Sequence, residues 1–146
     1  MISMADPIIT IGSNGDAVKK AQKALNDRGW WLTVDKIFGS LTRNAVVGYQ
    51  TQRSVGSGWE FSYPLKVDGI VGPATWSRLT PPVIKRKATG NAVRLLQELL
   101  NGNGYSPGPM DGKFGPLTET AVKDFQLGWL TVDGIVGGKT WAALGS

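Results

Sequence analysis

The chain has 146 residues, of which 41% are hydrophobic, and its 16 lysine and arginine residues exceed its 11 aspartate and glutamate residues to give a net charge of +5. This hydrophobic content is sufficient for one domain or two small domains with packed cores. Because the sequence contains neither cysteine nor histidine, it excludes disulfides, thiolate or imidazole metal sites and Ser-His-Asp or Cys-His catalysis, and we expect no cofactor.

The N-terminal segment, MISMADPIITIGSNG, lacks the basic start and the long apolar run of a secretory signal. No later segment reaches the length of a transmembrane helix, so we expect no membrane partner. Export would then need another route, such as release of a phage lysin, unless the chain is a fragment of a larger protein.

The first helix is expected within GDAVKKAQKALNDRG, residues 15–29, where apolar residues recur at helical spacing. Asn14 or Asp16 is expected to cap its start, because short polar side chains accept hydrogen bonds from the first free amides of a helix. Gly29 is expected to end it in the left-handed conformation.

Two further helices complete a first three-helix unit. The second follows Gly39 and carries Ala45, Val46 and Tyr49 on one face, and the third begins at Pro73, since proline is favoured in the first helical turn. The pattern then repeats, with helices expected near residues 91–101, 116–127 and 138–144. The predicted fold class is all-α, as two tandem three-helix bundles with little or no sheet.

One phrase, D-x-x-[FV]-G-x-x-T, occurs four times. Residues 35–42 read DKIFGSLT, 68–75 DGIVGPAT, 111–118 DGKFGPLT and 133–140 DGIVGGKT. Aspartate accepts hydrogen bonds from loop amides and glycine tolerates positive φ, so each copy is predicted to build a turn into a helix. The second glycine is expected to let the chain enter the helix without a Cβ clash. Lys36 replaces the first glycine in one copy, which leaves the positive φ open there.

The copies belong to a tandem duplication. Residues 15–30 match 90–105 at a shift of 75, residues 38–50 match 114–126 at a shift of 76, and residues 68–79 match 133–144 at a shift of 65. We therefore assign residues 1–80 to a first repeat and residues 81–146 to a second, joined by the stiff pair Pro81-Pro82. An insertion at residues 53–66 in the first repeat is expected to fold as a small hairpin or lid.

The motifs, taken in order, resemble a known family. The series G-x-x-V-x-x-x-Q-x-x-L, D-G-x-F-G-x-x-T-x-x-A-V-x-x-[FY]-Q and V-D-G-I-V-G-x-x-T-W-x-x-L is similar to the peptidoglycan-binding domain type 1, a three-helix module attached to bacterial and phage cell-wall hydrolases. The resemblance covers almost the whole chain as two copies. The first copy departs from the pattern at Lys36 and by 11 additional residues between Gln50 and Asp68. The resemblance implies attachment to the wall without catalysis.

The residues themselves are compatible with a chain that is not an enzyme. Glycoside cleavage needs two positioned carboxylates, and half of the eight aspartates already serve the repeated turns: Asp35, Asp68, Asp111 and Asp133. Each turn supplies one carboxylate rather than the several oxygens of a calcium loop. We expect no catalytic residue and no metal ligand here, and the abrupt end at Gly145-Ser146 suggests a fragment whose catalytic domain follows.

Aromatic residues outside the shared frame are the candidates for ligand binding, because flat rings on loops can stack on sugar rings. Arg53 is added to them because a guanidinium can pair with a carboxylate of the wall's stem peptide. The six candidates are Trp59, Phe61, Tyr63, Arg53, Trp31 and Trp129. The alternative for the ring cluster of the insertion is that it buries its own side chains. The tryptophans and other rings of the repeated frame, by contrast, are expected in the cores.

The prediction is therefore a peptidoglycan-binding module, monomeric, that acts at the bacterial cell wall, recognises the glycan or the stem peptide, and targets an attached hydrolase or endolysin. One alternative is a standalone wall-associated scaffold or targeting protein. Another is a basic helical nucleic-acid-binding protein, but the basic excess is 9 against 6 before Pro82 and 7 against 5 after it, rather than concentrated on one recognition helix.

Overall fold

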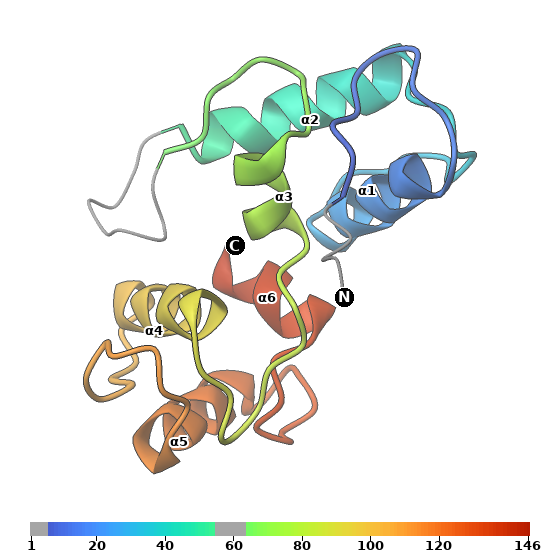
Figure 1. The fold of residues 1–146 in the computed structure, drawn as a ribbon. Helices are drawn as coiled ribbons and strands as arrows, with labels where there is room; N and C mark the ends of the chain where they lie inside the picture. The colour runs from blue at the N-terminus through green and yellow to red at the C-terminus, as the bar shows by residue number, and fades with distance from the viewer. Residues whose placement is uncertain (1–5, 55–63) are drawn as a thin grey trace. The chain divides into compact units, whose positions relative to one another are not determined.

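The computed structural model describes residues 6–54 and 64–146, and those residues form six helices joined by turns, with isolated β-bridges but no strand. They divide into two compact units, one of residues 6–54 with 64–80 and one of residues 81–146 (Figure 1). The predicted all-α fold class is confirmed.

Each unit contains two longer helices and a short third one. The first unit comprises α1 (Asp16–Asp27), α2 (Ser40–Gln52) and α3 (Pro73–Leu79). The second comprises α4 (Asn91–Gly102), α5 (Pro116–Gln126) and α6 (Gly138–Leu144). In both units the first helix contacts the other two, so α1 and α4 are the centres of the packing.

The start of α1 differs from the prediction. Gly15, with φ of 113°, is the N-cap and no side chain caps the helix, because Asn14 pairs with Ile37 in a β-bridge and Asp16 is already the first helical residue. The Asp16 carboxylate forms an ion pair with Lys36 instead, at 3.0 Å. The assignment of Asn14 or Asp16 as the cap was therefore wrong, whereas the left-handed Gly29 after the helix is confirmed, with φ of 98°.

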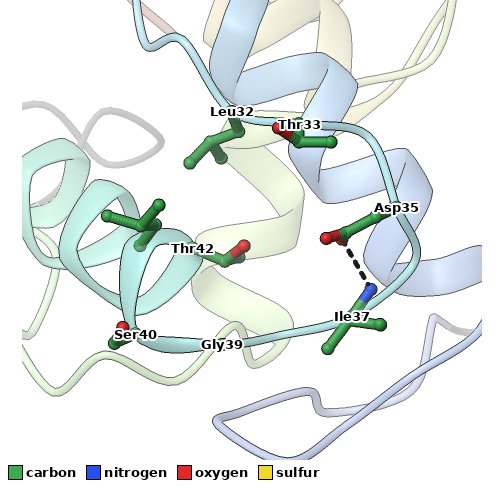
Figure 2. Close-up of a pocket in the computed structure, with 8 residues that line it drawn as sticks. Leu32, Thr33, Asp35, Ile37, Gly39, Ser40 and Thr42 are labelled. Carbon is green, nitrogen blue, oxygen red and sulfur yellow. Dashed lines mark hydrogen bonds between the residues drawn. The ribbon is translucent and has the colours of Figure 1, made fainter.

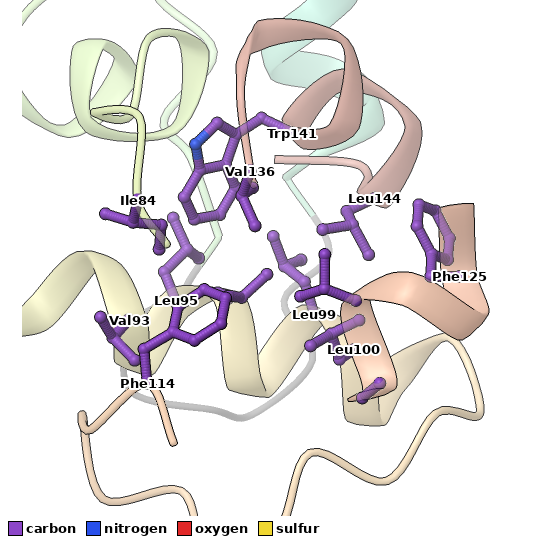
Figure 3. Close-up of a cluster of buried hydrophobic side chains, with 13 residues drawn as sticks. Ile84, Val93, Leu95, Leu99, Leu100, Phe114, Phe125, Val136, Trp141 and Leu144 are labelled. Atoms are coloured by element: carbon purple, nitrogen blue, oxygen red, sulfur yellow. The ribbon is translucent and has the colours of Figure 1, made fainter. Parts of the chain in front are cut away.

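The core of each unit is centred on the tryptophan of its third helix. Trp76 and Trp141 are 4% and 0% exposed, and each indole Nε1 donates to a carbonyl of the segment that leads into its unit, Pro7 at 2.8 Å and Pro82 at 2.9 Å. Figure 3 shows Trp141 in the apolar cluster of the second unit, which draws side chains from all three helices. The tryptophans of the repeated phrase are thus core residues, as predicted.

Candidate ligand-binding site

Each of the four turns that precede α2, α3, α5 and α6 closes around one buried glutamine of the helix before it. The four side chains are at most 1% exposed: Gln22, Gln50, Gln97 and Gln126. In every copy Nε2 lies within 3.3 Å of three acceptors, which are the aspartate carboxylate, the carbonyl two residues later and the threonine hydroxyl. The glutamine therefore joins one helix, the turn and the start of the next helix.

The opposite atom of each glutamine satisfies the turn's backbone. Gln126 Oε1 accepts from the amides of Asp133 and Gly134 at 3.2 and 3.0 Å. The aspartate Oδ1 also accepts from the amide two residues later, as from Ile135 to Asp133 at 2.9 Å. The predicted hydrogen bonds from loop amides to the aspartate are confirmed, and the buried polar groups of the turn are paired.

The two glycine positions of the phrase behave differently. The residue after the aspartate has positive φ in all four copies, and Lys36, with φ of 65°, adopts the same conformation as Gly69, Gly112 and Gly134. The second glycine is the N-cap of the next helix with φ near −100°, and a Cβ built on it would meet no atom within 4 Å. The expectation that this glycine avoids a Cβ clash was wrong.

Two of these aspartates have lowered pKa values for the same structural reason. The hydrogen bond from the Gln22 side chain, and then the amide of Ile37, lower the pKa of Asp35. At Asp111 the amide of Lys113 is the largest cause of a lowered pKa, which outweighs the opposing effect of desolvation. Both carboxylates are exposed, and they stay ionised over the neutral pH range.

The turn before α2 forms one wall of an open groove of about 220 Å³ (Figure 2). Leu32, Thr33, Asp35 and Ile37 line it from the turn, and the first residues of α2 complete it. Figure 2 shows the bond between the Asp35 carboxylate and the Ile37 amide at the edge of this groove. The groove thus combines apolar side chains with a hydroxyl and an ionised carboxylate.

Trp31 adjoins that groove. A second hollow of about 380 Å³ is lined by Trp30, Trp31 and the groove residues Leu32 and Thr33, so the two hollows are contiguous. Trp30 packs edge-on against Tyr49 with ring centroids 6.3 Å apart, whereas the neighbouring Trp31 is 98% exposed. Of these two adjacent tryptophans, Trp30 therefore packs within the unit and Trp31 faces solvent.

The second unit has a similar groove, of about 260 Å³, before α6. Leu130, Thr131, Asp133 and Ile135 line it from the turn. Trp129 directly precedes these residues and is 61% exposed. Its Nε1 donates to the Phe125 carbonyl at 2.9 Å, and its ring packs edge-on against the Phe125 ring at 5.4 Å, so the orientation of the exposed indole is fixed.

Arg53 lies at the end of α2 and is engaged within the first unit. Its guanidinium lies over the Tyr49 ring, 3.9 Å from the centroid, and Nη1 donates to the Tyr49 carbonyl and to Gln52. Burial lowers the pKa of Arg53 to about 10, which leaves it cationic at neutral pH. A role in binding a carboxylate stays a prediction.

The other three candidates, Trp59, Phe61 and Tyr63, lie outside the described residues, and so does most of the expected hairpin or lid. Among residues 6–54 and 64–146 there is no group of three or more acidic side chains suited to hold a metal ion. In the same residues no helix has the length and apolar content needed to span a membrane.

Two features were missed in the sequence. The first is the buried glutamine on the helix before each phrase, whose signal was its recurrence at equivalent places in the two repeats, Gln22 with Gln97 and Gln50 with Gln126. The second feature is the string W-L-T-V-D, which occurs at residues 31–35 and again at 129–133. These two strings contain the exposed Trp31 and Trp129, together with part of the lining of both grooves.

Comparison with known proteins gives consistent matches. The family model of the peptidoglycan binding domain matches the chain at residues 14–55 and 89–144. N-acetylmuramoyl-L-alanine amidase CwlL of Bacillus licheniformis is 33% identical over 142 residues, which cover 91% of this chain and 36% of the amidase. The spore cortex-lytic enzyme of Bacillus subtilis (strain 168) is 40% identical over 80 residues, which cover 53% of this chain and 26% of the enzyme. The chain thus spans only a minor part of the length of either relative.

Solved structures of similar proteins were also found. The SleB N-terminal domain is 42% identical with a TM-score of 0.42, and the match covers 44% of this chain and 90% of that domain. An endolysin of the Burkholderia phage AP3 is 26% identical with a TM-score of 0.44, and the match covers 80% of this chain and 36% of the endolysin.

Proposed function

Because the chain belongs to the peptidoglycan binding domain family, we propose that it is a non-catalytic module that attaches a cell-wall hydrolase or phage endolysin to peptidoglycan. The observation that carries this proposal is the presence of two copies of a binding domain, which together account for most of the chain. The relatives named as an amidase and a cortex-lytic enzyme are much longer than the matched region, which is consistent with a catalytic part elsewhere in such proteins.

The chemistry of the chain supports binding rather than catalysis. The sequence supplies no imidazole or thiol, and each repeated aspartate accepts a hydrogen bond from a turn amide through Oδ1. The exposed indoles of Trp31 and Trp129 and the grooves beside them offer surfaces for a ligand without a nucleophile and base in reach of each other. The expected partner is the glycan or the stem peptide of the wall, and the expected place of action is the cell wall.

Sedimentation with insoluble sacculi tests this function. The pure chain should co-sediment with sacculi, including sacculi stripped of teichoic polymers, and should release neither reducing ends nor free amines. Release of soluble muropeptides by the pure chain would show an enzyme, and failure to co-sediment would reject the binding function. A standalone wall-associated scaffold would also sediment, and it is distinguished by whether the natural protein includes a hydrolase domain.

A further inference from the structure

The repeated W-L-T-V-D string does not follow the duplication that produced the two units. Residues 31–35 and 129–133 are identical at a shift of 98, whereas the units align at shifts of 75, 76 and 65. The first string therefore lies in the turn before the second helix of its unit, and the second string lies before the third helix of its own unit. The same five residues occur at two positions that are not equivalent in the fold.

The fold does not require most of this string. The other two turns close around Gln50 and Gln97 with the same hydrogen bonds, yet residues 64–68 read PLKVD and residues 107–111 read PGPMD, so neither has the tryptophan or the threonine. Pro64 and Lys66 stand where the second unit has Trp129 and Thr131. Only the aspartate is common to all four turns, so the tryptophan and the threonine of the string serve something other than the turn.

The two tryptophans are also far more exposed than the tryptophans of the cores, although Trp129 packs against Phe125 on one side. Trp31 is 98% exposed and Trp129 is 61% exposed, while the core tryptophans Trp76 and Trp141 are almost fully buried. Exposing an indole to water forgoes the free energy that its burial would contribute to folding. An exposed apolar surface beside a groove is typical of a binding site. Trp31 lines the hollow next to the first groove, and Trp129 directly precedes the residues that line the second groove. Both grooves are lined by leucine, threonine, aspartate and isoleucine, and Lys139 lines the second one only.

The shared lining selects a class of ligand. An indole face and an isoleucine match the C–H face of a sugar ring and the methyl of an acetamido group. The hydroxyls of Thr33 and Thr131 have no hydrogen-bond partner within the residues that the structure describes, and only Oδ1 of Asp35 and Asp133 is used by the turn. The free Oδ2 can accept from a sugar hydroxyl or an acetamido N–H, but it repels the carboxylates of a stem peptide.

We propose that the two W-L-T-V-D turns are two copies of one glycan-binding site, each of which takes a neutral N-acetylhexosamine ring of the wall's glycan strand. This inference rests on the proposed function and specifies its ligand. Trp31 and Trp129 are the stacking platforms, and the threonines and the aspartates bind the polar edge of the sugar. Two sites on one chain then raise the avidity for an insoluble polymer.

The test measures binding of the whole chain and of its Trp31→Ala, Trp129→Ala and double variants to sacculi. Each single substitution is expected to weaken binding about tenfold and the double substitution about 100-fold or more, since linked sites contribute through effective concentration. Lys66→Ala, at the position of another turn that corresponds to Thr131, and Leu127→Ala, at a 70% exposed apolar side chain, are the controls and should bind as the parent chain does. Trp31→Ala, Lys66→Ala and Leu127→Ala should melt at the parent's temperature, because these side chains are exposed. Trp129→Ala also removes the contacts with Phe125 and should melt at a lower temperature, so its binding is measured well below its melting transition.

A soluble probe separates the ligand classes. Titration with a tetramer of β-1,4-linked N-acetylglucosamine should shift the tryptophan emission to shorter wavelength, and the double variant should lose that shift. If the parent chain binds sacculi but the double variant binds equally well, the site inference is wrong while the proposed function stands. If the tetramer fails to bind and a stem peptide binds instead, the glycan assignment is overturned. If the parent chain itself does not bind sacculi, the proposed function fails.

Discussion

Gln126 Nε2 lies 3.2 Å from Thr140 Oγ1, and this hydrogen bond joins the last residue of α5 to the first turn of α6. The same glutamine also bonds to Asp133 and to the Ile135 carbonyl, so one side chain fixes the path of the whole connection. Buried polar networks of this kind are stabilising only when every member is paired. Each unit contains two such hydrogen-bonded turns. We call each one a glutamine lock, which is the buried glutamine with its bonds to the aspartate, to the carbonyl two residues later and to the threonine.

The lock before α5 can be tested with two threonines two residues apart. Thr118 is 2% exposed, lies 3.1 Å from Gln97 Nε2 and donates to the Pro107 carbonyl at 2.9 Å, whereas Thr120 is exposed. Thr118→Val preserves the shape but removes one of the three acceptors of Gln97 Nε2 and the donor to the Pro107 carbonyl, so it should lower the free energy of unfolding by about 1–3 kcal/mol. Urea denaturation measures this change.

Thr120→Val is the control, because the same substitution on the exposed face of α5 should change the free energy of unfolding by less than about 0.5 kcal/mol. Equal effects of the two substitutions would mean that the cost comes from valine in a helix and not from the network.

The buried indole of Trp141 supplies a second prediction. Trp141→Ala removes a fully buried ring from the core of the second unit and should cost about 3–5 kcal/mol. Trp141→Phe keeps an aromatic ring but leaves the Pro82 carbonyl without the Nε1 donor, so its cost should be smaller. Thermal melting of both variants shows which of them is less stable. A phenylalanine variant as unstable as the alanine variant would contradict the view that Trp141 stabilises the unit mainly by packing.

The insertion gives a third prediction. If Trp59 and Tyr63 form a binding lip, replacing both by alanine should weaken binding to sacculi and leave the melting temperature nearly unchanged, since a solvent-facing ring contributes little to folding. Co-sedimentation and thermal melting of the same variant measure the two effects. A variant that unfolds, or one that binds as the parent chain does, would make these rings structural or irrelevant to the ligand.

The helices could be predicted from sequence because their signals are local and repeated. Apolar spacing predicts α1 and α4, and Pro73 marks the start of α3. The aspartate turns followed from the same kind of signal, since the carboxylate bonds to an amide only two residues away. The prediction from local signals failed at the start of α1. Asn14 pairs with Ile37 in a β-bridge, and Gly15 is the N-cap instead.

The candidate binding surfaces were harder to predict from the sequence, because the exposure of a side chain depends on packing between residues far apart in the chain. Trp30 and Trp31 are adjacent and chemically identical, yet only the first has a ring, that of Tyr49, to pack against. Arg53, by contrast, lies over Tyr49, four residues earlier, and this i, i+4 spacing at the end of α2 was a signal that the two side chains meet. The glutamine locks link residues 7 to 25 positions apart through buried atoms, which a local motif does not reveal.

The lowered pKa of Asp35 predicts how the stability of the fold depends on pH. Hydrogen bonds in the folded state lower its pKa below the value near 3.9 of an unfolded chain, so the ionised form stabilises the fold above that value. This stabilisation is lost as the pH falls through the lower folded pKa. Asp35→Asn should therefore lower the urea midpoint at pH 7 and pH 5, and the difference from the parent chain should shrink by pH 3.

Asp124→Asn is the matched control for that series. Asp124 is exposed on α5 and its carboxylate accepts no hydrogen bond from the residues that the structure describes, so the substitution should change the midpoint little at any of the three pH values. A difference for Asp35→Asn that is the same at pH 7 and pH 3 would show that the asparagine side chain, and not the lost charge, causes the effect.

The division into two repeats predicts that the second unit folds alone, provided that its first residues are kept. Trp141 donates to the Pro82 carbonyl, and Ile84 exchanges both backbone hydrogen bonds with Val136. A fragment of residues 81–146 should therefore be helical and melt cooperatively, because it contains its own core and both of its glutamine locks.

A fragment of residues 87–146 keeps all three helices but lacks Pro82 and Ile84, so it should melt at a lower temperature. Circular dichroism of the two fragments measures both effects. If the longer fragment is disordered while the whole chain folds, the chain is one fused core. If the two fragments melt alike, the segment before α4 does not contribute to the stability of the unit, and the bonds of Trp141 and Ile84 only guide the path of the chain.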